Sequence, residues 1–369
     1  MSKWVSTWGN AMSYKDVSPA EYAKDITLRY TVLNMFVGQA IRLSFDNFTG
    51  TEKVTLSDIT VDLNGEFYDV LFDGTNEVTL DAKEQKFSDP LSIDVKQGDI
   101  LLISYYLKDF TSLKCGVLTT GPYSSAQFAW GNETRNHTFP KKTSKKTNWV
   151  HFLNQIDVLT EDDKECIICY GDSITAQDWP DFVQMELFNE HANKAVIRRA
   201  VSGTRILREY DCLTYLAYGL KGDNRFDHEM EAASASSVII FQGINDIIHP
   251  VGANVNEYRP WSDLPTLEEL IDGLKKYIEK AKALNYKVYL VTLLPIEGWR
   301  TYADFREELR VGFNEWIRQS GEAVIDFDKA LRDEENIHKF KDIYDSGDHL
   351  HPSTLGYKKL AETALEAIR

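Results

Sequence analysis

Short stretches in which apolar and polar positions alternate dominate residues 1–160, and such alternation is typical of strands with one buried face. The predicted strands lie at 28–32, 40–45, 57–63, 91–95 and 100–106. Turn-forming pairs such as Asn64-Gly65 and Asp73-Gly74 separate them. Several short strands at this spacing predict a β-sandwich with a jelly-roll-like arrangement over residues 1–160.

After residue 161 the hydrophobic pattern changes, because apolar runs of strand length alternate with longer stretches of helical periodicity. The predicted strands lie at 165–170, 195–200, 237–242, 287–292 and 322–326, and the predicted helices at 179–191, 266–284, 302–320 and 353–368. In the last helix an apolar stripe is formed by Tyr357, Leu360, Ala361, Ala364, Leu365 and Ile368. This alternation predicts an α/β domain over residues 161–369, with a parallel sheet covered on both faces.

The length of 369 residues is sufficient for these two domains. Asp and Glu number 57 against 41 Lys and Arg, which gives a formal net charge of −16. Such a charge repels phosphate backbones and anionic lipid surfaces, so neither nucleic acid nor a membrane is expected as a partner. The oligomeric state is left open by the sequence.

No apolar run reaches the roughly 20 residues of a membrane span. The first five residues, Met1-Ser-Lys-Trp-Val5, lack the apolar core of a signal peptide. We therefore expect a cytoplasmic protein, or a secreted one if a leader has been removed from the sequence.

The chain has four cysteines, Cys115, Cys166, Cys169 and Cys212, which are too few for a disulfide framework at this length. Cys166 and Cys169 have CxxC spacing, but they fall in a predicted strand, where residues three apart point to opposite faces. We expect buried, reduced thiols there, and we expect no metal and no cofactor in the protein.

The candidate chemistry begins where the first strand of the second domain ends. Ligands of parallel sheets bind beyond the carboxyl ends of the strands. Gly171-Asp-Ser-Ile-Thr175 follows that strand and places Ser173 in a tight turn before a helix. A serine in such a turn is either a helix cap or a nucleophile exposed at the crevice.

A serine nucleophile needs a base, and the loop before the last helix offers one. In this loop Asp348 lies three residues before His351, so its carboxylate can fold back onto the imidazole. The alternative is a capping aspartate beside a surface histidine. His349 has no partner at the same offset, and we interpret it as structural or pocket-lining; a metal site in this loop lacks further ligands.

Two further loops supply hydrogen-bond donors. Gly203 follows the second strand and allows a close approach of backbone N–H. Asn245 follows the third strand, and its amide can donate to the oxyanion that acyl transfer creates. Each loop alone is also explained as a turn or a cap, but their shared position after successive strands favours acyl transfer.

The second half resembles the GDSL/SGNH hydrolases, which are named for Ser, Gly, Asn and His. The matching blocks are Gly171–Thr175, Ser202-Gly203, Gly243-Ile-Asn-Asp246 and Asp348-His-Leu-His351-Pro352, in family order within residues 165–369. The resemblance implies a flavodoxin-like three-layer α/β/α fold without a cofactor. It also implies that Ser173 is the nucleophile, His351 the general base oriented by Asp348, and that Ser173 N–H, Gly203 N–H and Asn245 form the oxyanion hole.

The match has one departure, since the family often has Asn and Gly shortly before Ser-Gly, where this chain has Arg198 and Ala200. No Gly-x-Ser-x-Gly elbow surrounds Ser173, which argues against the α/β-hydrolase superfamily. The first half, with Trp4-Val-Ser-Thr-Trp8, resembles the β-sandwich of two-domain SGNH esterases, and that branch is often associated with plant polysaccharides.

These resemblances imply a serine esterase that removes short acyl groups, in particular acetyl, from carbohydrates through an acyl-enzyme on Ser173. Its expected partner is a small-molecule or oligosaccharide ester. The alternatives are a lipase or acylhydrolase acting on lipid or thioester substrates, and a carbohydrate-binding protein with a vestigial hydrolase half. Four residues near the site loops could either contact substrate or only pack: Trp179, Arg205, Trp299 and Arg300.

Overall fold

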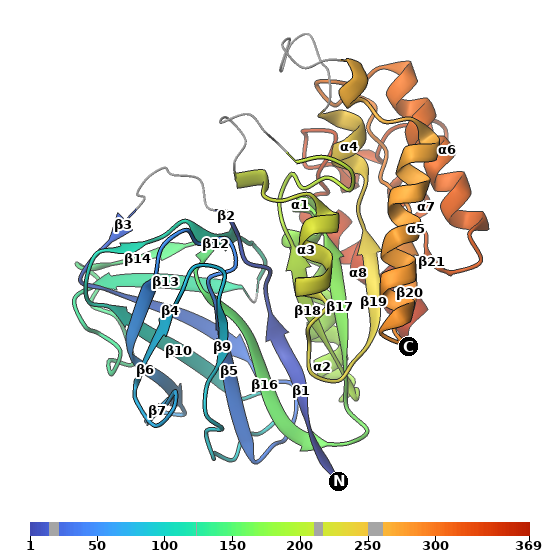
Figure 1. Cartoon of the computed structure of the whole chain (residues 1–369). Coiled ribbons are helices and arrows are strands. Elements are labelled where there is room, and N and C mark those ends of the chain that lie inside the picture. Colours follow the sequence, from blue (N-terminus) through green and yellow to red (C-terminus); the bar gives the residue numbers. More distant parts are fainter. Residues whose placement is uncertain (15–21, 123, 210–216, 250–260) are drawn as a thin grey trace. The chain divides into compact units, whose positions relative to one another are not determined.

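The computed structural model describes residues 1–14, 22–122, 124–209, 217–249 and 261–369. The chain forms two compact units, and Figure 1 shows their elements. The first unit contains residues 1–166, 184–199 and 232–235, and the second contains residues 167–183, 200–231 and 236–369. Cys212, named in the sequence analysis, lies outside the described residues.

The first unit is built from antiparallel sheets. One sheet has the order β1 (Ser2–Gly9), β16 (Leu153–Glu161), β5 (Ala40–Asp46) and β9 (Gln85–Phe87). The larger sheet has the order β14 (Ser144–Thr147), β13 (Ser125–Trp130), β4 (Ile26–Leu33), β10 (Ile100–Leu107), β6 (Val54–Leu63) and β7 (Glu66–Asp69), with β8 (Glu77–Leu80) paired to β6. Shorter strands pair as β15 (Trp149–Val150), β12 (Cys115–Leu118) and β2 (Ser13–Tyr14), and as β11 (Thr111–Ser112) and β3 (Tyr22–Ala23).

Both large sheets contribute to one apolar core, which makes this unit the predicted sandwich. Leu43 and Phe45 of β5 belong to the same buried cluster as Ile103 and Tyr105 of β10. The rings of Phe45 and Tyr105 meet edge to face at 5.1 Å. Alternating side chains of each sheet therefore point into a shared interior, as in other sandwiches.

The strand predicted at 91–95 is not formed. Only isolated bridges join Leu91 to Ile41 and Val95 to Gly38. Ile93 and Val95 are buried, so the apolar pattern reports contact with the core rather than a continuous backbone ladder. The pattern of burial alone does not distinguish these two cases.

In the second half of the chain a five-stranded sheet has the order β18 (Lys194–Ala200), β17 (Glu165–Gly171), β19 (Ala235–Phe241), β20 (Lys287–Val291) and β21 (Ala323–Ile325). The pairs β19–β20 and β20–β21 are parallel. Most positions of these strands are buried, which explains why they appear in the sequence as continuous apolar runs. The predicted α/β fold class is confirmed.

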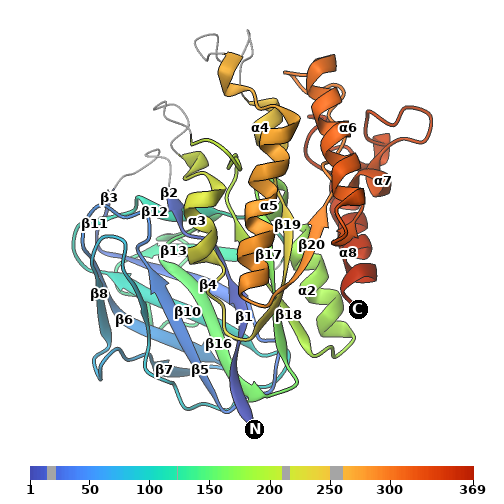
Figure 2. The ribbon, with the colours of Figure 1, turned by 45° about the vertical axis from the view of Figure 1, so that its right-hand side comes forward.

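Helices flank this sheet. Their bounds are α1 (Ser173–Ala176), α2 (Trp179–Asn189), α3 (Gly222–Glu229), α4 (Ile244–Ile248), α5 (Leu267–Ala283), α6 (Asp304–Gln319), α7 (Phe327–Leu331) and α8 (Thr354–Ile368), with 3₁₀ turns η2 (Trp261–Asp263) and η3 (Asp342–Tyr344). Figures 1 and 2 show α3 and α5 on one face of the sheet and α8 on the other. Within the described part of the chain, no helix has both the length and the apolar character needed to cross a membrane.

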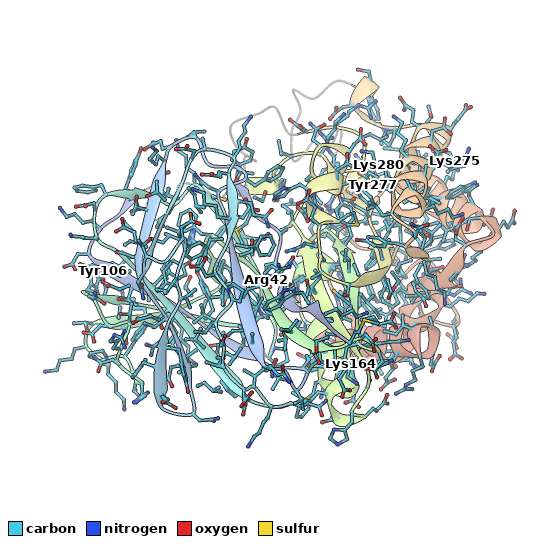
Figure 3. The ribbon with its side chains drawn as sticks, turned by 60° about the horizontal axis from the view of Figure 1, so that its bottom comes forward. Arg42, Tyr106, Lys164, Lys275, Tyr277 and Lys280 are labelled. Carbon is cyan, nitrogen blue, oxygen red and sulfur yellow. The ribbon has the colours of Figure 1, made fainter. Side chains whose placement is uncertain are left out.

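The helix α5 shows how local sequence and packing agree. The hydroxyl of Thr266 accepts the N–H of Glu269, whose carboxylate accepts the N–H of Thr266 in return, a capping box that starts the helix. Its apolar side buries Leu270, Leu274 and Tyr277. The Tyr277 ring, labelled in Figure 3, stacks on Phe226 of α3 at 4.8 Å. Contacts of this kind fix the positions of the helices, and with them the loops that precede these helices.

Candidate active site

The turn that carries Ser173 is specified by its neighbours. Strand β17 ends at Gly171 and α1 begins at Ser173. A Cβ at Gly171 would lie 2.7 Å from the carbonyl oxygen of Phe241, so a side chain has no room there. The carboxylate of Asp172 accepts the N–H of Ile174 at 3.0 Å and caps α1. Ser173 is therefore held at the carboxyl end of a central strand, where the sequence places it.

The loop before α8 brings the base to this serine. Ser173 Oγ lies 2.9 Å from His351 Nε2. His351 Nδ1 lies 2.7 Å from Asp348 Oδ2, and Asp348 Oδ1 accepts the backbone N–H of His351 at 2.8 Å. With its Nδ1 proton donated to Asp348, the imidazole presents Nε2 as the acceptor for the serine hydroxyl.

Asp348 is maintained as a carboxylate. Its partial burial alone would raise the pKa, but the hydrogen bonds from the His351 ring, the His351 N–H and the Leu350 N–H outweigh burial and hold the pKa well below its usual value. The charge needed to orient and stabilise a protonated imidazole is therefore present throughout the neutral range.

The two predicted donor residues lie at the same cavity. Ser173, Gly203, Asn245 and His351 all line a space of about 260 Å³. Gly203 has φ +80°, and a Cβ there would overlap the ring of Tyr218, so the position requires glycine. Asn245 is buried and gives one amide hydrogen to Thr204 O at 3.2 Å, which leaves its second amide hydrogen for the cavity.

Asp246 holds the loop after Gly203 in place, a role that the sequence analysis missed. Its two carboxylate oxygens accept the N–H groups of Ile206 at 2.7 Å and Leu207 at 3.0 Å. Burial raises the pKa of Asp246 to about 6 in spite of these bonds. Its position next to Asn245 in the block Gly243–Asp246 was the available signal.

Asp172 is a second buried carboxyl group beside the nucleophile. Burial raises its pKa to about 7, while the N–H of Ile174 and the charges of His351 and Arg225 act in the opposite direction. Its Oδ2 has no hydrogen-bond partner among the described residues. The folded protein therefore favours the protonated form of this group far more than the unfolded chain does.

His349 has no carboxylate partner three residues earlier, in agreement with its prediction, but it has one at a different offset. Its Nδ1 lies 2.6 Å from Asp345 Oδ2, so a carboxylate partner exists four residues earlier rather than three. The residue has φ +63°, and its ring lies against Gly298, where an added Cβ would come within 2.7 Å. His349 is absent from the cavity lining and supports the loop instead.

The other residues near the site loops divide in two. Trp179 is fully buried and packs edge to face on Phe327, and Arg205 pairs with Asp263 at 3.0 Å. Trp299 and Arg300 line the cavity. The first two therefore stabilise the unit, and the second two are placed to contact a ligand.

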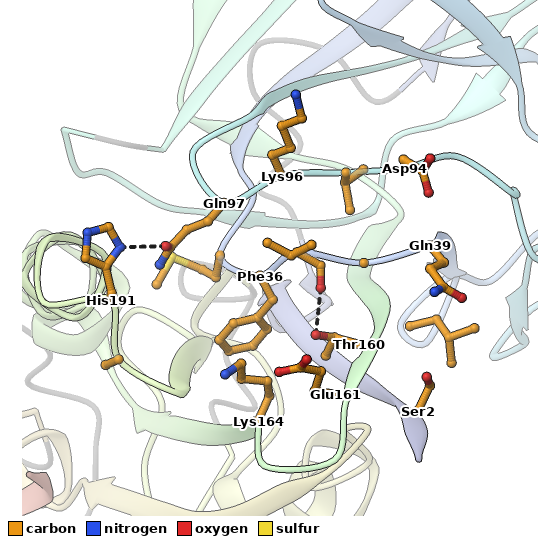
Figure 4. A pocket seen from close by; sticks show the side chains of 16 residues that line it. Ser2, Phe36, Gln39, Asp94, Lys96, Gln97, Thr160, Glu161, Lys164 and His191 are labelled. Atoms are coloured by element: carbon orange, nitrogen blue, oxygen red, sulfur yellow. Dashed lines mark hydrogen bonds between the residues drawn. The ribbon is translucent and has the colours of Figure 1, made fainter.

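A larger cavity of about 570 Å³ lies in the first unit (Figure 4). Charged side chains of both signs, including Lys96, Lys164 and Glu161, surround it, and His191 Nδ1 contacts Gln97 Oε1 at 2.7 Å. It contains none of the residues selected from the sequence. The residues that the structure describes form no cluster of three or more His, Cys, Asp or Glu side chains suited to a metal ion.

Replacing Asp172 tests the energetic cost of its burial. A folded-state pKa of about 7 against 3.8 means that the native state binds more protons between these values, so this group's contribution to stability is complete below about pH 4 and is lost as pH rises through about 7. In urea titrations, Asp172→Asn should therefore have a higher free energy of unfolding than wild type. This gain should be larger at about pH 8 than at about pH 5, by on the order of 1–3 kcal/mol.

The matched control is Asp304→Asn, at an exposed position at the start of α6, which should change stability little at either pH. Equal loss of stability at both pH values in Asp172→Asn would contradict the prediction.

Residues 169–359 match the GDSL-like lipase/acylhydrolase family. A search of curated proteins finds no match.

Several solved structures are similar to part of this chain. A catalytic mutant of an acetylxylan esterase from Geobacillus stearothermophilus is 18% identical, with 55% of this chain and 94% of that chain covered and a TM-score of 0.42. A GDSL-like lipase from Bacteroides thetaiotaomicron VPI-5482 is 18% identical, with coverages of 55% and 87% and a TM-score of 0.39. A psychrotrophic esterase from Pseudoalteromonas sp. is 16% identical, with coverages of 56% and 97% and a TM-score of 0.37.

The family match extends over more than half of the chain and includes Ser173, Gly203, Asn245, Asp348 and His351. The chain belongs to the GDSL-like lipase/acylhydrolase family.

Proposed function

We propose that the protein is a serine carboxylester hydrolase that acts by two-step acyl transfer at Ser173. The observation that carries this proposal is the continuous hydrogen-bond chain from Ser173 Oγ through the His351 ring to Asp348. Family membership supports ester hydrolysis in general. The assignment of roles to single residues rests on their geometry.

In the first step Ser173 Oγ attacks the ester carbonyl carbon while its proton passes to His351 Nε2. Asp348 stabilises the resulting imidazolium through Nδ1. The proton then moves from Nε2 to the leaving alcohol as the tetrahedral intermediate collapses to an acyl-enzyme. Water repeats the sequence on the acyl-enzyme, which releases the acid and restores Ser173 and neutral His351.

The oxyanion of the tetrahedral intermediate accepts hydrogen bonds from Ser173 N–H, Gly203 N–H and the Asn245 amide. Ser173 is the first residue of α1, so its N–H is not used within that helix. Fixed donors of this kind stabilise the developing charge without reorganisation during the reaction.

The proposed substrates are short acyl esters, in particular acetyl esters, of carbohydrates. The cavity of about 260 Å³ accommodates a small acyl group. Its lining includes the aromatic residues Tyr218 and Trp299, whose faces suit sugar rings, and Leu350 is its one aliphatic side chain longer than alanine among the described residues. A long hydrocarbon chain has little apolar surface here.

Replacement of the nucleophile tests the mechanism. Ser173→Ala should reduce kcat/KM for 4-nitrophenyl acetate by about 10³-fold or more, and it should abolish labelling by a phosphonate ester. Ser202→Ala is the matched control, since Ser202 lines the same cavity, and it should retain activity and labelling. Near-wild-type turnover by Ser173→Ala would exclude the mechanism.

A substrate panel tests the class of ester. Acetylated xylo-oligosaccharides should be hydrolysed with higher kcat/KM than 4-nitrophenyl palmitate or an acyl thioester, because the cavity is small. Preference for the long-chain ester or the thioester would assign the protein to the lipid acylhydrolases instead. Failure of the wild type to react with the phosphonate would favour a carbohydrate-binding protein without catalysis.

Removal of one oxyanion donor should affect the transition state more than the bound substrate. Asn245→Ala is expected to lower kcat by about 10²–10³-fold with little change in KM. Thermal unfolding must be measured beside it, because the same amide also holds Thr204 O. An equal rise of KM with unchanged kcat would show that Asn245 serves binding only.

A further inference from the structure

The charge of the candidate active site differs from that of the whole protein. The net charge is −16, yet none of the described residues that line the cavity is Asp, Glu or Lys. Arg300 is the one permanently charged residue among the described residues that line it. A substrate that approaches this cavity therefore meets a local positive charge within a negatively charged protein.

The guanidinium of Arg300 has no carboxylate partner in the part of the chain that the structure describes. Its one contact among the described residues is with the ring face of Trp299, 4.9 Å from the ring centroid. The nearby carboxylates are engaged elsewhere, since Glu297 accepts from the Asn336 amide at 3.0 Å and Asp345 binds His349. An exposed arginine without an acid partner retains its full capacity for a bidentate bond to an anion.

The backbone that carries Arg300 is firmly anchored. Glu297 N–H donates to His338 O at 3.0 Å, and Tyr302 N–H donates to Trp299 O at 2.8 Å. Thr301 Oγ1 donates to Ile248 O at 2.7 Å, which ties this segment to the helix α4 that holds Asn245. The backbone position of Arg300 is thus fixed relative to the proposed oxyanion donors, while its guanidinium makes no hydrogen bond with the residues that the structure describes.

Trp299 supplies a second donor at the same turn. Its indole Nε1 is buried and has no hydrogen-bond partner among the described residues. An unsatisfied buried donor is costly, whereas the neighbouring guanidinium of Arg300 is exposed and has no acceptor among the described residues. Both residues line the cavity, and a ligand with anionic oxygens supplies the acceptor that the exposed Arg300 lacks.

We propose that Arg300 is a specificity-determining residue that selects esters carrying a carboxylate close to the scissile bond, which deepens the proposed function and rests on it. The carboxylate can belong to the acyl group, as in a dicarboxylic half-ester, or to the alcohol, as in an acetylated uronic acid. Both sources present the same planar anion to the guanidinium fork.

Two matched substrate pairs distinguish the sources. The acyl pair is 4-nitrophenyl acetate and 4-nitrophenyl hydrogen succinate. The alcohol pair is an O-acetylated methyl glucoside and the corresponding O-acetylated methyl glucuronide. For each pair the measured quantity is the ratio of kcat/KM for the anionic ester to that for the neutral ester.

Arg300→Gln should lower this ratio by about 5–10-fold for one pair, because the loss falls mainly on the anionic ester. Arg300→Lys should restore part of the ratio, since it keeps the charge but loses the fork. Lys276→Gln is the matched control; it removes the same charge from an exposed position on α5 and should leave the ratio unchanged. A fall confined to the succinate pair assigns the acyl side, and one confined to the glucuronide pair assigns the alcohol side.

The wild type provides a test that needs no substitution. Raising NaCl from about 0.05 M to about 0.5 M should raise KM for the favoured anionic ester and leave its neutral counterpart unchanged, because salt screens the attraction. Unchanged ratios in Arg300→Gln, an equal loss for neutral and anionic esters, or an absence of salt dependence would each overturn the assignment of Arg300. Absence of turnover of all four esters by the wild type would instead overturn the proposed function, and the assignment of Arg300 with it.

Discussion

Two hydrogen bonds, Ser173 Oγ to His351 Nε2 and His351 Nδ1 to Asp348 Oδ2, are the interaction on which the rest of the site depends. They join segments separated by 178 positions in the chain, so they form only if the sheet brings the end of β17 and the loop before α8 together. The imidazole can accept from serine at one nitrogen only while the other donates to the carboxylate. The backbone N–H of His351, which also donates to Asp348, ties the orientation of the ring to the conformation of the loop.

The architecture that creates this meeting was largely predictable. Strands such as β17 and β20 are buried along most of their length, and α5 and α8 carry apolar stripes, so their patterns are unambiguous. The predictions were wrong where side chains are buried but the backbone forms no continuous strand pairing, as at 91–95, or where an element is short. The helix α3 has eight residues, of which Asp223, Asn224, Arg225, Asp227, His228 and Glu229 are polar or charged, and its buried Arg225 gives no apolar signal.

The site was predictable to the extent that its requirements are local. Gly171 and Gly203 are needed because a neighbouring carbonyl or ring occupies the space of a Cβ, and the motifs record these needs directly. Tyr218, Trp299 and Arg300 reach the cavity through loops whose course depends on distant contacts, such as Thr301 with Ile248. No spacing in the sequence reports such a course, so Trp299 and Arg300 could be named only as neighbours of the site loops, and Tyr218 was missed.

Two buried carboxyl groups, Asp246 and Asp172, lie beside the site, and the contacts of only one of them require a carboxylate. Asp246 uses its two oxygens to accept two consecutive N–H groups, and an asparagine would place its NH₂ donor against one of them. The geometry of the loop after Gly203 thus requires a carboxylate in spite of the desolvation that raises its pKa. Asp172 accepts one N–H through Oδ1 while Oδ2 has no partner among the described residues, so its contacts require a single acceptor oxygen and not a charge. Burial of a charged carboxylate therefore has different consequences at the two positions. At Asp246 its cost is offset by the hydrogen bonds that position the proposed oxyanion donors. At Asp172 it is relieved by protonation.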